Sequence, residues 1–197
     1  MPLYYSEAQR GLAEVFIHDN GNVHVMTNTR CGHTSMRNYF NMERLGDRRD
    51  HNHRWLEWIE SKSRRVLVLR NPIDRWQSAE IFHSVEWWVK NGPSPTHEGK
   101  IMDRDFWIWI HRSPFLIDIP KDLTFEIIPF EDLDDYIPMH KDTIVSNTSG
   151  VKYSDLTDIP TGTGRTQECL IEELASYQHF RDNCKIISPD EWKQLTP

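Results

Sequence analysis

The chain has 197 residues, 38% of them hydrophobic and 27% charged, and its 23 Lys+Arg against 30 Asp+Glu give a net charge of −7. This length suits a single domain over residues 1–197 with a core of ordinary size, and the acidic balance disfavours a nucleic-acid-binding protein. Without a membrane-length apolar run, a signal-peptide pattern or a C-x-x-C pair, the sequence predicts a soluble, cytoplasmic protein with no disulfide framework and no zinc site.

The first part of the chain predicts a β-hairpin that leads into a helix. Residues 15–18 and 23–26 are strand-like and flank Asp-Asn-Gly-Asn, a turn sequence. After the polar segment 27–35, apolar residues recur at helical spacing, so we expect a helix to begin at Thr34 or Ser35. A strand, a short polar loop and a helix are therefore expected in this order.

The middle of the chain predicts a central strand between two helices. Residues 65–69 form an apolar run with no alternation, which is typical of a parallel strand buried on both faces. A short helix is expected over 52–61 and a longer one over 73–89. A further strand is expected at 124–128, whereas 106–111 is too apolar for periodicity to distinguish helix from strand.

The last third predicts a long polar loop and two helices. The loop is expected over 138–166 and the first helix over 167–181. Ser188, Pro189 and Glu191 form the N-cap, N1 and N3 pattern of a final helix. The whole predicts a single α/β domain with a central, mainly parallel sheet flanked by helices, in which ligands bind at the carboxyl ends of the strands.

Two loops leave such strand ends, and the first has the composition of an anion-binding loop. Residues 29–36 read Thr-Arg-Cys-Gly-His-Thr-Ser-Met. A loop that enters a helix offers backbone N–H groups and the positive end of the helix dipole to a phosphate. Gly32 allows a close approach and Arg30 adds a positive charge, although the Lys of the usual nucleotide P-loop is missing. The alternative is an ordinary strand–helix turn with a capping hydroxyl.

The second loop, residues 70–78, reads Arg-Asn-Pro-Ile-Asp-Arg-Trp-Gln-Ser. Arg70 stands at the end of the predicted strand and Ser78 about two turns into the next helix. With Arg75, these side chains provide two cations and a hydroxyl for a second phosphate. The alternative is an ordinary helix start, with Asp74 favourable to the helix dipole and Arg75 solvated.

Together the two loops resemble those of the PAPS-dependent sulfotransferases, which use 3′-phosphoadenosine 5′-phosphosulfate (PAPS). The family's 5′-phosphosulfate loop, Pro-Lys-x-Gly-[ST]-[ST]-[ST]-Leu, is similar to residues 29–36, and its 3′-phosphate motif, Arg-[DHN]-Pro-x-[DE]-Arg-x-x-Ser, matches residues 70–78 without a gap. Phe-Glu-Asp-Leu at 130–133 looks like the family's Tyr-Glu-Asp-Leu segment. The resemblance covers roughly 22–182 and implies a P-loop NTPase-like sulfotransferase fold, with PAPS as co-substrate, PAP as product and no metal.

The resemblance also implies which residues form the site. Arg70 and Ser78 would bind the 3′-phosphate, and Arg165, in a Gly-rich segment, would fold over the nucleotide. The layout looks closest to the uronyl 2-O-sulfotransferases, in which a His-x-His pair precedes the second strand. His53 is therefore the expected catalytic base and His51 the second choice, since histidine titrates near neutral pH. The 5′-phosphosulfate would lie against Arg30, Cys31, Gly32, His33, Thr34 and Ser35, with Arg30 also acting in catalysis.

The expected acceptor is a hydroxyl or amine of a small molecule or carbohydrate, and two other hypotheses stay open. Arg30 and His33 stand where the family has Lys and a small hydroxyl residue, which would suit a non-catalytic PAP-binding protein. Residues 31–37 also satisfy the Cys-x5-Arg pattern of cysteine-dependent phosphatases, with Cys31 as nucleophile. That pattern leaves residues 70–78 unexplained, so the sulfotransferase hypothesis is preferred. The sequence predicts no particular oligomeric state.

Overall fold

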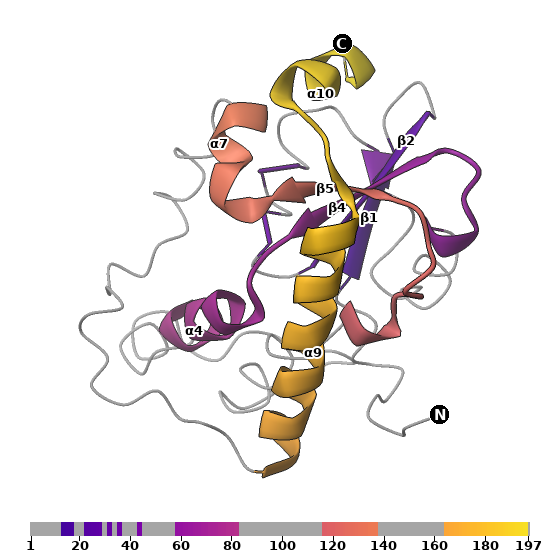
Figure 1. Cartoon of the computed structure of the whole chain (residues 1–197). Coiled ribbons are helices and arrows are strands. Elements are labelled where there is room, and N and C mark those ends of the chain that lie inside the picture. Colours follow the sequence, from indigo (N-terminus) through magenta and orange to yellow (C-terminus); the bar gives the residue numbers. More distant parts are fainter. Residues whose placement is uncertain are drawn as a thin grey trace, which may run out of the picture.

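The structure is a computed structural model, and it describes residues 13–17, 22–28, 31–32, 35–36, 43–44, 58–82, 116–137 and 164–196. Its centre is a six-stranded sheet in the order β3-β1-β2-β4-β5-β6 (Figure 1). The strands are β1 (Ala13–Ile17), β2 (Val23–Asn28), β3 (Glu43–Arg44), β4 (Arg64–Leu69), β5 (Glu126–Pro129) and β6 (Lys185–Ile186).

The sheet is mainly parallel, as the sequence predicts. β1 and β2 form the expected antiparallel hairpin, with Ala13 opposite Asn28, whereas β2, β4, β5 and β6 run parallel to one another. β3 pairs antiparallel with β1 at one edge, and β6 forms the other edge. The sequence does not predict β3 and β6, because a two-residue strand is too short to produce a periodic pattern. The expected α/β class is confirmed.

Helices lie against both faces of this sheet (Figure 1). Within the described ranges, no helix is long and apolar enough to cross a membrane. The expected helix at 73–89 is confirmed over the part described. The helical elements are α4 (Pro72–Phe82), η2 (Leu116–Asp118), η3 (Phe130–Asp132), α7 (Leu133–Tyr136), α9 (Gly164–Asn183) and α10 (Pro189–Leu195).

One expected helix boundary differs in the structure. α9 begins at Gly164, so Gly164 and Arg165 lie in its first turn and not in a loop. The residues before 170 carry no apolar positions at helical spacing, and periodicity therefore places the start of this helix too late. Of the short helix expected over 52–61, the described residues 58–60 are helical. The segment 106–111 and most of the expected loop 138–166 lie outside the described residues.

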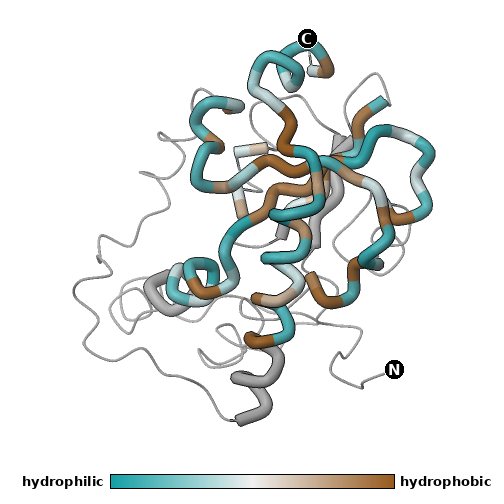
Figure 2. The backbone as a smooth tube through the Cα atoms, viewed as in Figure 1, coloured by the Kyte–Doolittle hydropathy of each residue, from teal (hydrophilic) through white to brown (hydrophobic). Residues whose placement is uncertain are grey.

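The core forms two clusters, one on each face of the sheet, and β4 contributes to both. Val66 and Val68 pack into one cluster, and Leu67 and Leu69 into the other. Figure 2 shows hydrophobic residues concentrated in these central strands, with hydrophilic residues along the outer helices. This alternation explains the apolar run that identified the strand, since both sets of side chains leave water.

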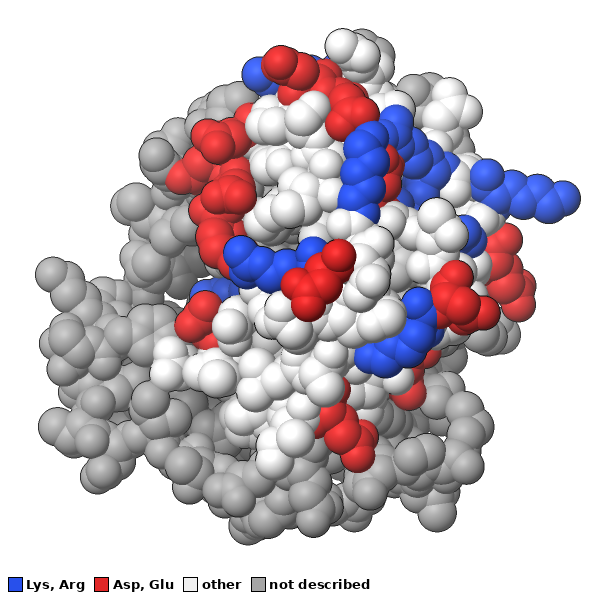
Figure 3. Space-filling view, viewed as in Figure 1, with Lys and Arg blue, Asp and Glu red and all other residues white. Residues whose placement is uncertain are grey.

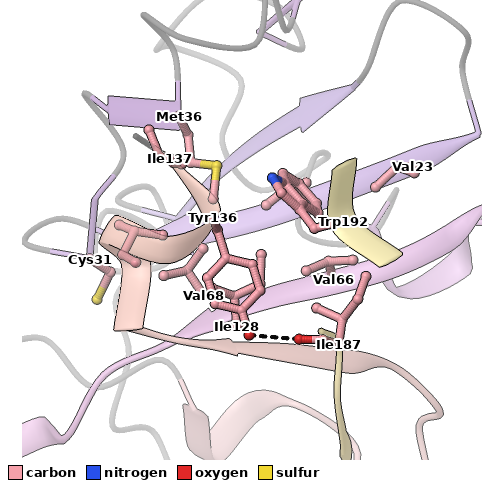
Figure 4. Close-up of a cluster of buried hydrophobic side chains, with 12 residues drawn as sticks. Val23, Cys31, Met36, Val66, Val68, Ile128, Tyr136, Ile137, Ile187 and Trp192 are labelled. Atoms are coloured by element: carbon pink, nitrogen blue, oxygen red, sulfur yellow. Dashed lines mark hydrogen bonds between the residues drawn. The ribbon is translucent and has the colours of Figure 1, made fainter. Parts of the chain in front are cut away.

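Helix α9 covers one cluster, and α7 with α10 covers the other. In the first, Tyr177 and Phe180 of α9 pack with Met26, Trp58, Leu67, Leu69, Leu116, Ile119, Phe125 and Ile127. In the second cluster, the buried side chains of α7 and α10 pack against the side chains of the strands (Figure 4). The Tyr136 hydroxyl donates a hydrogen bond of 2.6 Å to the backbone oxygen of Ile187, which ties α7 to the segment before α10.

The final helix begins where the sequence predicts. Ser188 Oγ accepts a hydrogen bond of 3.2 Å from the backbone N–H of Glu191, and Glu191 Oε2 accepts one of 3.1 Å from the N–H of Ser188. Pro189 follows the N-cap, so the expected capping box is confirmed. Trp192, one residue after Glu191, is buried in the second cluster and anchors α10 to the sheet.

A row of alternating charges joins the amino ends of three parallel strands to α10. Arg64 of β4 binds both carboxylate oxygens of Glu126 on β5, and Lys185 of β6 lies 3.2 Å from the same carboxylate. Lys185 also contacts Glu191 at 2.6 Å. That ammonium group, with the N–H of Ser188, lowers the pKa of Glu191 to about 2. This row lies at the end of the sheet opposite to the two predicted loops.

Candidate anion-binding site

The two predicted anion-binding loops leave the sheet at the same end, the carboxyl end of the parallel strands. β2 and β4 are neighbouring parallel strands, with Met26 opposite Leu67. β5 continues the arrangement, with Pro129 opposite Leu69. Because parallel strands end together, the segments that follow β2, β4 and β5 start side by side, where ligands of α/β proteins bind. These three segments form the candidate site.

The first loop turns into its helix at Gly32. The backbone N–H of Met36 donates a hydrogen bond of 3.0 Å to the oxygen of Gly32, and Ser35 and Met36 are helical, so the expected helix start is confirmed. Gly32 has a φ of 78°, and a Cβ at this position would lie 2.4 Å from Leu133 Cδ2 and 3.6 Å from Phe130 Cε2. The positive φ therefore favours glycine, and a Cβ at this position would also force the Leu133 side chain to move.

Phe130 connects this turn to the second loop. The guanidinium carbon of Arg70 lies 4.2 Å from the centroid of the Phe130 ring, a cation–π contact. The same ring lies 3.6 Å from the position that a Cβ on Gly32 would occupy. Arg70 of the second loop and the Gly32 turn of the first loop therefore both lie near the Phe130 ring. This contact is the structure's main contribution to the site.

The second loop leads into α4 through residues that favour the start of a helix. Asn71 Oδ1 accepts a hydrogen bond of 2.9 Å from the N–H of Ile73, and its backbone oxygen accepts one of 3.0 Å from Arg75. Asn71 is therefore the N-cap, Pro72 occupies the first helical position, and Asp74 lies in the first turn. The Asn-Pro-x-Asp part of the motif builds the helix start that Arg70 precedes.

Arg75 has a role that neither sequence interpretation gave it. Its side chain is 1% exposed, and its Nη2 donates hydrogen bonds of 2.9 and 3.2 Å to the two carboxylate oxygens of Glu173, which is 0% exposed. Arg75 is thus neither solvated nor directed at an external anion, and both predictions for it are wrong. Its partner lies 98 residues later, beyond the reach of local patterns.

The two described hydroxyl side chains expected to bind phosphate, those of Ser35 and Ser78, are buried. Ser35 is 1% exposed and Ser78 is 8% exposed. Ser78 comes three residues after Arg75 on α4 and therefore lies on the same side of the helix, towards α9. A ligand that reaches Ser78 does so next to the α4–α9 contact.

Cys31 lies inside the second core cluster. Its side chain is 0% exposed and packs with residues of the first helix turn and of α7 (Figure 4). A nucleophilic thiolate has to meet its substrate, and reactive cysteines are partly exposed. The burial of Cys31 therefore argues against the phosphatase hypothesis.

A polar cluster on α9, formed by Tyr177 and Arg181, contacts η3 beside the site. Arg181 Nη1 donates to the Tyr177 hydroxyl and lies 3.4 Å from Glu131 Oε1, in the residue after Phe130. Burial is the main cause of the raised pKa of Tyr177. Sequence reasoning missed Arg181, and it singled out the segment 130–133 by resemblance without giving Phe130 a place in the site. The i, i+4 spacing of Tyr177 and Arg181 was the available signal, but it does not reveal contact with η3.

The surface beside this cluster is acidic. Glu131, Asp132, Asp134 and Asp135 follow one another through η3 and α7, and Figure 3 shows carboxylates gathered over these elements. At this end of the sheet the cationic Arg70 therefore lies near a row of carboxylates. Such a row of carboxylates disfavours the binding of an extended polyanion, such as a heavily sulfated polymer, along η3 and α7.

Some predicted site residues lie outside the described residues: Arg30, His33, Thr34, His51 and His53. Of Arg165, the structure describes the backbone position in the first turn of α9. In the described part of the chain, no three His, Cys, Asp or Glu side chains are grouped as metal ligands. The chain matches no protein-family model, no curated protein and no solved structure.

Proposed function

We propose that this protein is a PAPS-dependent sulfotransferase with the P-loop-like fold of that family. The observation that carries the proposal is the position of the two loops: they leave neighbouring parallel strands at the carboxyl end of the sheet, and the Phe130 ring contacts Arg70 and lies 3.6 Å from the place that a Cβ on Gly32 would occupy. Each loop also leads into a helix, as the two phosphate sites of such an enzyme require.

The described residues fit a nucleotide with a 3′-phosphate. Arg70 precedes the N-terminus of α4, where its guanidinium adds to the positive end of the helix dipole. Since Arg75 is committed to Glu173, Arg70 supplies the positive charge of this segment. Ser78 is the second proposed 3′-phosphate ligand. Around the Gly32 turn, Arg30, the backbone N–H groups and the hydroxyls of residues 34–35 would hold the 5′-phosphosulfate.

The proposed chemistry is in-line sulfuryl transfer. PAPS supplies the sulfuryl group: the bond between sulfur and the bridging phosphate oxygen breaks as the acceptor oxygen or nitrogen bonds to sulfur, and PAP leaves. His53, with His51 as the alternative, accepts the acceptor's proton. Arg30 stabilises the negative charge that develops on the leaving phosphate. As in phosphoryl transfer, the protein acts mainly by positioning and by charge stabilisation.

The row of carboxylates along η3 and α7 favours an acceptor without dense negative charge. Four carboxylates between residues 131 and 135 follow directly after Phe130, at the edge that carries both loops. Their field would repel a heavily sulfated polymer, whereas a small molecule or a neutral sugar meets no such barrier. We therefore propose an uncharged hydroxyl or amine acceptor, small-molecule or carbohydrate.

Calorimetric titration with PAP and with AMP, which lacks the 3′-phosphate, tests the nucleotide site. The unmodified chain is expected to bind PAP more tightly than AMP. Arg70→Ala should weaken PAP binding by about tenfold or more, because a charge-assisted contact to phosphate is lost, and should leave AMP binding nearly unchanged. Lys62→Ala, on an exposed residue before β4, is the matched control and should change neither affinity. An unmodified chain that does not bind PAP would overturn the proposal.

A transfer assay with labelled PAPS separates the enzyme from a non-catalytic binder. His53→Ala is expected to abolish transfer while PAP affinity persists, because the base contacts the acceptor and not the nucleotide. Unchanged transfer in this variant would remove His53 from the role of base. PAP binding without transfer to any hydroxyl or amine tested would favour the non-catalytic hypothesis.

A further inference from the structure

Helix α9 contacts the element that follows Arg70 in the sequence. In its middle, Glu173 binds Arg75 of α4, five residues after Arg70, with both side chains almost completely buried. A single nitrogen, Arg75 Nη2, contacts both carboxylate oxygens, so this buried ion pair joins the two helices at this point.

The same helix also contacts the element beneath Arg70. Near the C-terminal end of α9, Arg181 lies 3.4 Å from Glu131 of η3. Phe130, the residue before Glu131, makes the cation–π contact with the guanidinium of Arg70. Tyr177, one turn before Arg181, is buried in the first core cluster and attaches α9 to the sheet. Helix α9 is therefore connected to Arg70 indirectly in two ways, through α4 and through η3.

Stability alone does not account for the buried pair of Arg75 and Glu173. Removing two charges from water costs about as much as their attraction returns, and apolar residues of similar volume are often as stabilising or more so. A directional ion pair can instead select one orientation of the helices. Here that orientation includes the anion-binding end of α4 and, one turn after Arg75, the buried hydroxyl residue Ser78.

We propose that Arg75 and Glu173 are positioning residues for the 3′-phosphate. Their ion pair fixes the first two turns of α4 against α9, and thereby places Arg70 and Ser78 together. This inference rests on the proposed function. It gives the second arginine of the 70–78 motif a role distinct from phosphate binding.

The double variant Arg75→Met/Glu173→Leu tests the role, because it keeps the buried volume and removes both charges. It is expected to unfold at a temperature equal to or above that of the unmodified chain. Its dissociation constant for PAP should rise by about tenfold or more, whereas that for AMP should stay within about twofold. Glu172→Gln, on the exposed neighbour of Glu173, is the matched control and should change neither value.

A second variant, Glu173→Asp, keeps both charges and moves the carboxylate back by one methylene group. It should also weaken PAP binding more than AMP binding, which covers the case in which the double variant fails to fold. A folded double variant with unchanged PAP affinity would overturn the positioning role and leave the proposed function intact. Equal losses for PAP and AMP would indicate a general structural role and overturn it as well. An unmodified chain that does not bind PAP overturns both proposals.

Discussion

Replacing Gly32 with alanine tests the geometry of the first loop directly. An L-residue at the φ of 78° found here costs about 1–2 kcal/mol relative to glycine. The new methyl group would lie 2.4 Å from Leu133 Cδ2, so Leu133 or the turn has to shift, and overpacking of this kind costs about 1–3 kcal/mol. Together the two effects predict a loss of about 2–5 kcal/mol in the free energy of unfolding.

Thermal unfolding followed by circular dichroism provides the measurement. For a domain of this size, 1 kcal/mol corresponds to about 2–4 °C, so Tm should fall by about 5–20 °C in Gly32→Ala. Leu133→Ala, alone and combined with Gly32→Ala, completes a double-mutant cycle. Because the shortened side chain removes the steric conflict, the two changes together should cost less than their sum. A loss below about 0.5 kcal/mol in Gly32→Ala would refute the proposed turn geometry.

The remaining predictions concern charges and a buried hydroxyl. Glu173→Gln removes the carboxylate charge that faces the buried Arg75 guanidinium and should cost about 3–5 kcal/mol in urea unfolding; a loss under 1 kcal/mol would contradict the burial of the pair. The pKa of Glu191, about 2 because of the Lys185 ammonium, lies below the ordinary value of 4.5, so its stabilisation is complete above about pH 4.5 and is lost as the pH falls through about 2. Glu191→Gln should therefore flatten the loss of stability in acid, and an unchanged pH profile would count against this contact. Tyr136→Phe leaves a buried backbone oxygen without its donor and should cost about 1–3 kcal/mol by chemical denaturation, whereas an unaffected midpoint would exclude that hydrogen bond.

The sheet was predictable where local patterns are strong. The turn sequence between β1 and β2 specifies the hairpin, and the apolar run at 65–69 specifies a strand that is buried on both faces. The capping box at Ser188 fixed the start of α10 to the residue. The two-residue strands were not predictable, because pairing with a neighbouring strand, and not their own sequence, makes them strands.

The candidate site was predictable only in part, because its contacts are long-range. The order of strands and loops predicted that Gly32 and Arg70 lie at the same end of the sheet, but it did not predict the contact between Arg70 and the Phe130 ring. The Arg75 side chain pairs with a carboxylate 98 residues away in the sequence. From the local motif alone, such an arginine is expected to be exposed to solvent or to bind a ligand. Burial of Cys31 likewise follows from packing against α7, which no neighbouring residue signals.

The distance between Arg75 and Glu173 along the chain has a consequence for biosynthesis. A ribosome completes β2, β4, α4 and β5 well before it reaches α9, so the growing polypeptide carries an arginine whose counter-ion has not yet been translated. The orientation of α4 is therefore set late, when the C-terminal portion emerges. A product terminated upstream of α9 would retain both loops and yet lack the carboxylate that pairs with Arg75 of α4.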